Sequence, residues 1–433
     1  MTPIVVGIIG ILILFVLLFL GMNVGLALLL IGFVGQAYIA GFAPTFGGLR
    51  MIPYSTFASY SLSVIPLFIL MGNLAFHSGL SRDLYLAARN WLGRLRGGLA
   101  MASVAACAAF AACSGSSVAT AATLGKIALP EMKRYNYDDG LATGTLAAGG
   151  TMGILIPPSV ILIIYGILTE QSIGKLFLAG VIPGILEAVF YIITIYILTT
   201  LYPSWGPPGP KTTVREKFIS LRDTWGFIAL FLLVIGGIYM GVFSPTEAGG
   251  IGAFGTFIFC LLRRRLRWDT FKESLIDSGQ TAAMIFLIML GANFFGHFLA
   301  VTGLPAALTA SLATLAVSRY VILLLVFIFY LILGCVMDSM AMILITVPIF
   351  FPLALELGFN PIWFGIFITR VTEIGMVTPP VGMNLYVIKG VAKDVPMSTL
   401  FRGVFPFVIA DILHVALITA LPILATFLPS MMR

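Results

Sequence analysis

The stretch 150–160 reads GTMGILIPPSV and sets two adjacent prolines, Pro157 and Pro158, inside an apolar and glycine-rich segment. A proline in a helix interior removes a backbone hydrogen bond, clashes with the preceding turn and costs about 3 kcal/mol. This stretch therefore predicts a helix that is broken at the proline pair, with backbone carbonyls that need other partners.

The composition predicts that this break lies in a lipid bilayer. Of the 433 residues, 60% are hydrophobic and only 9% are charged, and the mean hydropathy is +1.09. Since about 20 apolar residues cross a bilayer as a helix, we expect a polytopic membrane protein. There, a helix break is tolerated only where protein or a water-filled cavity satisfies the freed backbone groups. The apolar runs that predict spans are 3–20, 22–40, 61–77, 178–201, 225–241, 246–262, 278–301 and 401–428.

The charged residues and the cysteines argue against other classes of protein. The net charge of +7 comes from basic residues in short loops between spans, where they set topology, so no nucleic acid is expected as a partner. The cysteines lie in apolar segments without a C-x-x-C spacing, which predicts neither a disulfide framework nor a metal site. They are Cys107, Cys113, Cys260 and Cys335. No pairing of a nucleophile with a base is apparent, so we do not expect the protein to be an enzyme.

A second proline pair, Pro379-Pro380, lies in the stretch 374–384, IGMVTPPVGMN. The offset that sets Pro157 on Pro379 also sets SSVAT at 116–120 on DSMAM at 338–342. Further along, LFLAGVIPG from position 176 echoes LFRGVFPF from position 400 with a small slip in register. Together these three features indicate an internal repeat.

The repeat predicts the domain organisation and the fold class. A first repeat at 1–210 is joined by a cytoplasmic linker at 211–223 to a second repeat at 224–433. Each half makes five crossings and carries one re-entrant helical hairpin, which does not change sides. Because five is odd, the second half is inverted, as in many secondary transporters. We therefore expect an all-α polytopic membrane protein with two inverted-topology repeats, about ten transmembrane helices and two hairpins.

The segment 98–130 is too rich in small residues and too often interrupted to be one comfortable span, which predicts a re-entrant hairpin, and the repeat predicts its partner at 320–352. The predicted elements are hairpins at 98–130 and 320–352, with tips at 113–117 and 334–339, and broken helices at 140–170 and 361–391. The amphipathic segment 82–96 precedes the first hairpin and should lie in the membrane interface. In SPTE at 244–247, Ser244 and Glu247 predict a capping box with a structural role.

Basic residues predict the orientation in the membrane. If the amino terminus is outside, most of the 24 Lys and Arg residues fall in cytoplasmic segments. The outside receives only Arg50, Lys175, Arg319 and Arg433. The positive-inside rule therefore predicts that both termini lie outside.

Four motifs carry a resemblance to a known family. They are SGSSVATAATLGKIALPEMKRYNY (114–137), GILIPPS (153–159), SPTEAGG (244–250) and GMVTPPVGMNLYV (375–387). In order and spacing they resemble the large membrane subunit of tripartite ATP-independent periplasmic (TRAP) transporters, the DctM-like family, over nearly the whole chain. The resemblance implies sodium-coupled import of an organic acid by an elevator motion in the cytoplasmic membrane of a bacterium or archaeon. It also implies two partners, a periplasmic substrate-binding protein and a small four-helix membrane subunit.

The hairpin tips and broken helices predict two sodium sites. A tip that abuts an unwound helix brings together serine hydroxyls and carbonyls without helical partners, which suit a small cation. In the first half the predicted ligands are Ser114, Gly115, Ser117, Thr151 and Gly153. In the second half they are Gly334, Asp338, Ser339, Met376 and Thr378. The alternative is that serine and glycine only allow close helix packing.

Charged residues inside spans need a reason, because a buried charge is expensive in a bilayer. Arg370 and Glu373 are three residues apart on one helix and could pair with each other. Alternatively, Arg370, or the helix termini at the tips, binds the substrate carboxylate. Glu187 and Asp411 occupy nearly equivalent places in the last span of each half, where we expect structural polar contacts.

Two other transport mechanisms compete with the TRAP interpretation. A channel would also need broken helices, but its filter usually arises from symmetric rings of carbonyls or charges. A stand-alone sodium/dicarboxylate carrier of the same broad group is the closer alternative. The sequence does not name the substrate.

Overall fold

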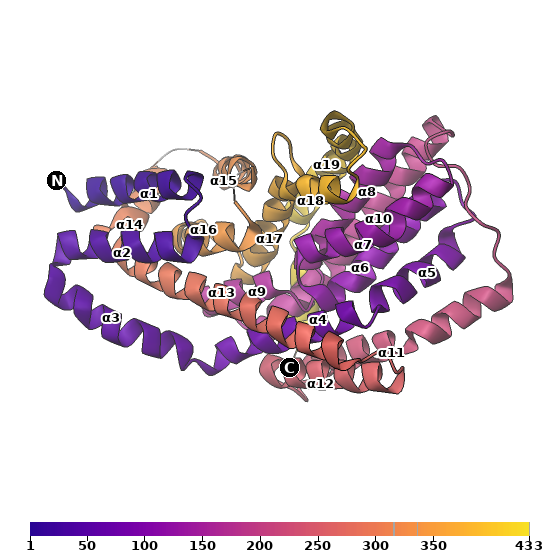
Figure 1. Ribbon diagram of the computed structural model, residues 1–433. Helices are drawn as coiled ribbons and strands as arrows, with labels where there is room; N and C mark the ends of the chain where they lie inside the picture. Colours follow the sequence, from indigo (N-terminus) through magenta and orange to yellow (C-terminus); the bar gives the residue numbers. More distant parts are fainter. Residues whose placement is uncertain (315–316, 336, 433) are drawn as a thin grey trace.

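The computed structural model describes residues 1–314, 317–335 and 337–432, and every element in these ranges is helical (Figure 1). The first half contains α1 (Pro3–Phe19), α2 (Val24–Ala40), α3 (Phe42–Phe57), η1 (Tyr60–Ser63), α4 (Val64–His77), α5 (Leu80–Leu92), α6 (Gly98–Ser114), α7 (Ser117–Arg134), α8 (Asp139–Thr151), η2 (Met152–Ile154), α9 (Val160–Leu168) and α10 (Ile173–Leu201). The second contains α11 (Val214–Tyr239), α12 (Pro245–Leu262), α13 (Trp268–Thr302), α14 (Leu304–Thr314), α15 (Arg319–Gly334), α16 (Ser339–Glu356), α17 (Pro361–Val377), α18 (Met383–Val391), α19 (Met397–Ala420) and α20 (Ile423–Met431).

The order of these helices shows the expected repeat. Helices α6 and α7 form the first hairpin and α15 and α16 form the second, and the broken helix α8–α9 corresponds to α17–α18. The offset between the two proline pairs also separates the first residue of α7 from that of α16, and the first residue of α8 from that of α17. The hairpins run slightly further than predicted, to Arg134 and to Glu356. The all-α fold with two hairpins and two broken helices is therefore confirmed.

Six helices of the described residues are long and apolar enough to cross a membrane, and α11 makes a seventh if counted across its bend. Five of the six, α4 with η1, α10, α12, α13 and α19, are predicted crossings, and the sixth, α16, is a hairpin arm. The other predicted crossings are α11, α1 and α2, the last two of 17 residues each, and the two broken helices. In the first broken helix the break leaves parts of 13 and 9 residues, both too short to cross alone, whereas in the second it leaves parts of 17 and 9 residues.

Three features of the fold differ from what the sequence predicts. The run 401–428 is not one helix, because α19 ends at Ala420 and Pro422 precedes α20. The amphipathic segment 82–96 is helical only to Leu92, since glycines follow at positions 93, 97 and 98, and Gly97 has a φ of +69°.

The third difference is α3, a helix that the sequence analysis left unassigned. The second half has one 35-residue helix, α13, where the first half has α3, η1 and α4. Pro66 lies in the first turn of α4, where its missing N–H is tolerated but a helix arriving from before it would be disrupted. Helix α13 contains no proline.

The two halves are intertwined rather than side by side. Helix α2 packs along α13, and α4 packs along α12. The hairpin arm α7 contacts α18 of the other half, and α16 contacts α9 in the equivalent way. In Figure 1, α1, α2 and α3 lie at one end of the molecule, α5 to α8 with α10 lie at the other, and α13 runs diagonally from the first end toward α4.

The predicted capping box at the start of α12 is present. The Ser244 hydroxyl accepts a hydrogen bond from the Glu247 backbone N–H at 3.3 Å, and the Glu247 carboxylate accepts one from the Ser244 N–H at 2.8 Å. These bonds satisfy backbone donors at the helix end.

Candidate functional site

Each hairpin tip meets the broken helix of its own half. In the first half, Gly153 lies so close to the tip that a Cβ there would be 2.5 Å from the Ser116 carbonyl oxygen. Gly115, with a φ of +56°, lies beside Val160 and the Pro158 carbonyl. The glycines at the tip and at the break allow this approach because they carry no side chain.

The second tip repeats the arrangement. Gly334 and Gly375 pack backbone to backbone, and a Cβ on Gly375 would lie 2.9 Å from the Gly334 Cα. Both proline pairs lie in the non-helical gaps, between η2 and α9 and between α17 and α18, and both Pro-Pro peptide bonds are cis. The breaks that the prolines predict are therefore present in both halves.

A cavity of about 260 Å³ lies where the two tips converge. Besides the tips and breaks, it is lined by α4 and α13, from a different part of the fold. The lining residues are Ile69, Asn73, Ser114, Gly115, Ser116, Ser117, Val118, Ala119, Ile154, Val160, Ile161, Thr281, Met284, Ile285, Asp338, Ser339, Met340, Met376 and Met383. Residues that correspond to each other in the two repeats therefore line one shared cavity.

The predicted ligands divide into those that line this cavity and those that do not. The lining set is Ser114, Gly115, Ser117, Asp338, Ser339 and Met376. Gly153 and Gly334 lie at the backbone contacts behind the tips. The Thr378 hydroxyl donates to the Ile374 carbonyl at 2.6 Å, in the last turn of the preceding helix α17. The Thr151 hydroxyl contacts Glu187 at 3.2 Å, away from the tip.

Both helices that leave the tips begin at the cavity with a capping side chain. The Ser116 hydroxyl accepts from the Ala119 N–H at 3.3 Å, and the Asp338 carboxylate accepts from the Ala341 N–H at 2.7 Å. Ser116 and Asp338 are equivalent in the repeat. The positive ends of the α7 and α16 dipoles therefore lie at the cavity wall, which favours an anion there.

Asn384 is a cavity-region residue that the sequence analysis missed. Its side chain is fully buried, and its Nδ2 donates to the Ser117 hydroxyl at 2.6 Å and to the Ala147 carbonyl at 3.2 Å. The signal was available, because Asn384 is a lone polar amide four residues after Pro380 in an apolar segment.

Arg370 lies in a closed polar cluster rather than at the cavity. Its guanidinium donates to Glu187 at 2.8 Å, to Glu373 at 2.6 Å, to His414 Nδ1 at 2.9 Å and to Asp411. All five side chains are buried. The predicted pairing of Arg370 with Glu373 and the structural contacts of Glu187 and Asp411 are thus present. This conformation does not support the hypothesis that Arg370 binds substrate.

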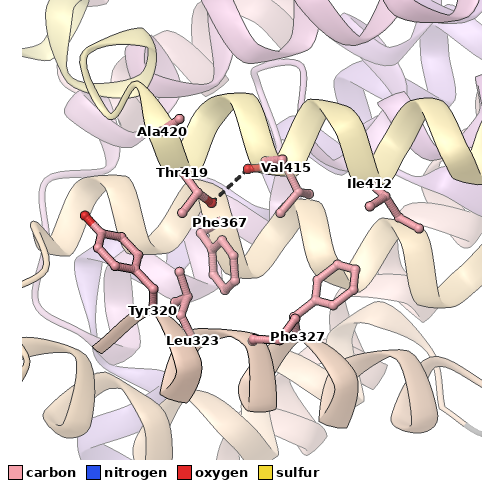
Figure 2. A pocket seen from close by; sticks show the side chains of 10 residues that line it. Tyr320, Leu323, Phe327, Phe367, Ile412, Val415, Thr419 and Ala420 are labelled. Atoms are coloured by element: carbon pink, nitrogen blue, oxygen red, sulfur yellow. Dashed lines mark hydrogen bonds between the residues drawn. The ribbon is translucent and has the colours of Figure 1, made fainter. Parts of the chain in front are cut away.

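A larger cavity, of about 420 Å³, lies between α15, α17 and α19 (Figure 2). Apolar side chains such as Leu323, Phe327 and Phe367 line it, and the Thr419 hydroxyl is occupied by a bond to the Val415 carbonyl at 2.8 Å. It offers no charged group to an organic anion. The cavity between the tips is therefore the candidate functional site.

Paired hairpins that meet broken helices around a central cavity define a secondary-transporter architecture. Residues 11–424 match the family model described as "Tripartite ATP-independent periplasmic transporter, DctM component". The chain belongs to this family of multi-pass membrane proteins.

Two relatives and one solved structure illustrate the similarity. The C4-dicarboxylate TRAP transporter large permease protein DctM of Pseudomonas aeruginosa is 38% identical over 92% of this chain and 93% of its own length. The sialic acid TRAP transporter large permease protein SiaM of Vibrio cholerae is 32% identical over 96% of both chains. The crystal structure of the Alcanivorax borkumensis YdaH transporter superposes with a TM-score of 0.63 at 15% identity, over 90% of this chain and 89% of that one. That structure supports the fold, and the relatives' names confirm a transporter permease rather than an enzyme.

Proposed function

We propose that this chain is the large transport subunit of a sodium-coupled importer of an organic acid anion. The observation that carries the proposal is the cavity shared by both hairpin tips, which lies against α4 and α13. The P. aeruginosa and V. cholerae relatives are named for a C4-dicarboxylate and for sialic acid. Both substrates are carboxylates, so the substrate of this chain is expected to be a carboxylate as well.

The tips supply oxygen groups for sodium and helix ends for the anion. Serine hydroxyls and unwound carbonyls are hard ligands of the kind that coupling ions use in broken-helix transporters. The N-termini of α7 and α16 supply backbone N–H groups for the substrate carboxylate. Sodium therefore binds beside the substrate, and each favours the other.

The position of the cavity supports an elevator motion. Hairpin tips and broken helices form one wall, whereas α4 and α13 form the other. In this proposal the first group moves as a body against the second and carries the site across the membrane. Both termini face outside, and the membrane is the cytoplasmic membrane of a bacterium or archaeon.

Two partners complete the proposed transporter, as the word tripartite in the family description suggests. One is a periplasmic binding protein that delivers the substrate, and the other is the small membrane subunit. The alternative is a stand-alone sodium/dicarboxylate carrier, which would need neither.

Reconstitution in liposomes tests both possibilities. We expect uptake of the anion only when the small subunit, the loaded binding protein and an inward sodium gradient are all present. Uptake by this chain alone would establish the stand-alone carrier. Uptake that is unchanged after sodium is replaced by potassium would exclude sodium coupling.

A further inference from the structure

Asn384 makes a short side-chain contact between the two halves at the candidate site. The amide Nδ2 lies 2.6 Å from the Ser117 hydroxyl and 3.2 Å from the Ala147 carbonyl. A carbonyl can only accept a hydrogen bond, so it requires the amide nitrogen on this side of Asn384. The orientation of the side chain therefore follows from its neighbours.

This bond joins the first hairpin tip to the second broken helix. Ser117 is the first residue of α7 and lines the cavity, whereas Asn384 is the second residue of α18, after the Pro379-Pro380 break. The two residues are 267 positions apart. Met383, the neighbour of Asn384, lines the same cavity. A displacement of the second break therefore moves the donor that holds Ser117.

The contact has no counterpart related by the repeat. The register of the repeat sets Asn384 on Leu162 and Ser117 on Ser339. The side chain of leucine has no hydrogen-bond donor, so Leu162 cannot hold Ser339 in this way. The repeat therefore provides no equivalent of the Asn384–Ser117 contact at Ser339.

Within the described part of the chain, the amide oxygen of Asn384 is a free hydrogen-bond acceptor. Asn384 Oδ1 is buried and has no hydrogen-bond partner among the described residues. Buried polar atoms are nearly always paired, and an unpaired one calls for a ligand or an explanation. An amide oxygen is a ligand that a small hard cation accepts.

We propose that Asn384 is a positioning residue that orients Ser117 for the cation at the first tip and couples this site to the second break. The inference rests on the proposed sodium-coupled function. Binding at the second site orders α18 and hence Asn384, which makes Ser117 a better ligand, and linkage requires the converse effect. Sodium should therefore bind cooperatively, through this one side chain.

A sodium titration of thermal unfolding, with the full chain and its small subunit, tests the proposal. In Asn384→Leu, which introduces the residue found at the equivalent position, we expect the half-saturating sodium concentration to rise about fivefold or more. We also expect the Hill coefficient to fall toward one. Ser117→Ala should shift the titration similarly, and the double variant should be no worse than the larger single effect, because both remove one contact.

The matched control is Asn293→Leu. In the wild type, Asn293 Nδ2 donates to the Thr56 hydroxyl at 2.9 Å, and neither residue lines the cavity. It should keep the wild-type sodium titration. If Asn384→Leu unfolds without sodium, Asn384→Gln keeps the amide and displaces it by one methylene, and the same shift is expected. A wild-type sodium curve for the Asn384 variant, or multiplicative effects in the double variant, would overturn the inference. Absence of any sodium effect on the wild type would instead refute the proposed function.

Discussion

The guanidinium of Arg370 is surrounded by three carboxylates, from Glu187, Glu373 and Asp411, in the protein interior. Its Nε also donates to His414, so the imidazole accepts at Nδ1. Each carboxylate keeps one oxygen without a partner among the described residues. The cluster depends on its single cation, since removal of one partner of a buried ion pair leaves an uncompensated charge.

This dependence gives the first prediction. Arg370→Gln should destabilise the protein by about 3–5 kcal/mol, because the carboxylates lose their counter-charge. Thermal unfolding followed by intrinsic fluorescence measures the effect, and adding Glu373→Gln should recover part of the loss. If Arg370→Gln instead kept wild-type stability and lost only substrate uptake, Arg370 would act on the substrate.

Substitution of Asp338 tests whether its side chain caps α16 or also ligates a cation. Asparagine caps helices about as well as aspartate, whereas alanine loses about 1 kcal/mol. We predict that Asp338→Asn keeps both the stability and the sodium dependence of uptake, and that Asp338→Ala lowers stability. An increased sodium requirement in Asp338→Asn with unaltered stability would show that the charge itself ligates sodium.

At the scale of elements, α5 is held between a hairpin arm and a helix of the other half. Arg89 of α5 pairs with Glu131 of α7 at 2.6 Å, and Asp83 pairs with Arg263 and Arg265, at the end of α12, at 2.8 and 2.7 Å. The Arg89–Glu131 pair is mostly buried, with 26% and 19% of the two side chains exposed. Helix α5 therefore connects the end of α12 to the first hairpin.

A charge exchange tests this connection. Arg89→Glu should slow sodium-dependent uptake because it places two carboxylates opposite each other, at a cost of about 1 kcal/mol. The exchange Arg89→Glu with Glu131→Arg should restore most of the rate. Equal uptake by the single variant and the wild type would mean that the connection through α5 does not contribute to uptake.

The proline pairs define the breaks in the two broken helices. If Pro157 and Pro158, or Pro379 and Pro380, keep the chain unwound, alanines should allow a helix to re-form, with a gain of up to roughly 3 kcal/mol per proline. We expect either double variant to fold, to lose sodium-dependent uptake and to show weaker sodium protection against unfolding. Normal transport with intact sodium protection would place the cation elsewhere.

At the scale of the whole molecule, the prediction is the orientation of the two halves. Cysteines introduced at exposed Lys211 and exposed Glu356 should be labelled from opposite sides, Lys211→Cys from the cytoplasm and Glu356→Cys from outside. Cys107, Cys113 and Cys260 are buried and Cys335 is half-buried, which keeps the background low. Labelling of both probes from one side would contradict the arrangement of five crossings in each half.

Sequence alone determined the parts of the fold that depend on local backbone chemistry. The breaks at 155–159 and 378–382, the turn at Gly115 and the capping box at Ser244 arise from prolines, glycines and caps acting within a few residues. The constant offset between matching motifs added the repeat. A single proline was not sufficient, because Pro183 and Pro406 lie inside the continuous helices α10 and α19.

Only the tertiary structure decided which distant side chains share a site. Asn384 meets Ser117 across 267 positions, and Arg370 meets Glu187 across 183. No local pattern encodes such pairs, because they depend on how α7 packs on α18 and how α10 packs on α17. The sequence grouped Thr151 with the tip residues, yet a hydroxyl on a helix faces whichever neighbour packs against it, and here that neighbour carries Glu187. Position along the chain specified the helix breaks, whereas packing between helices specified the partners.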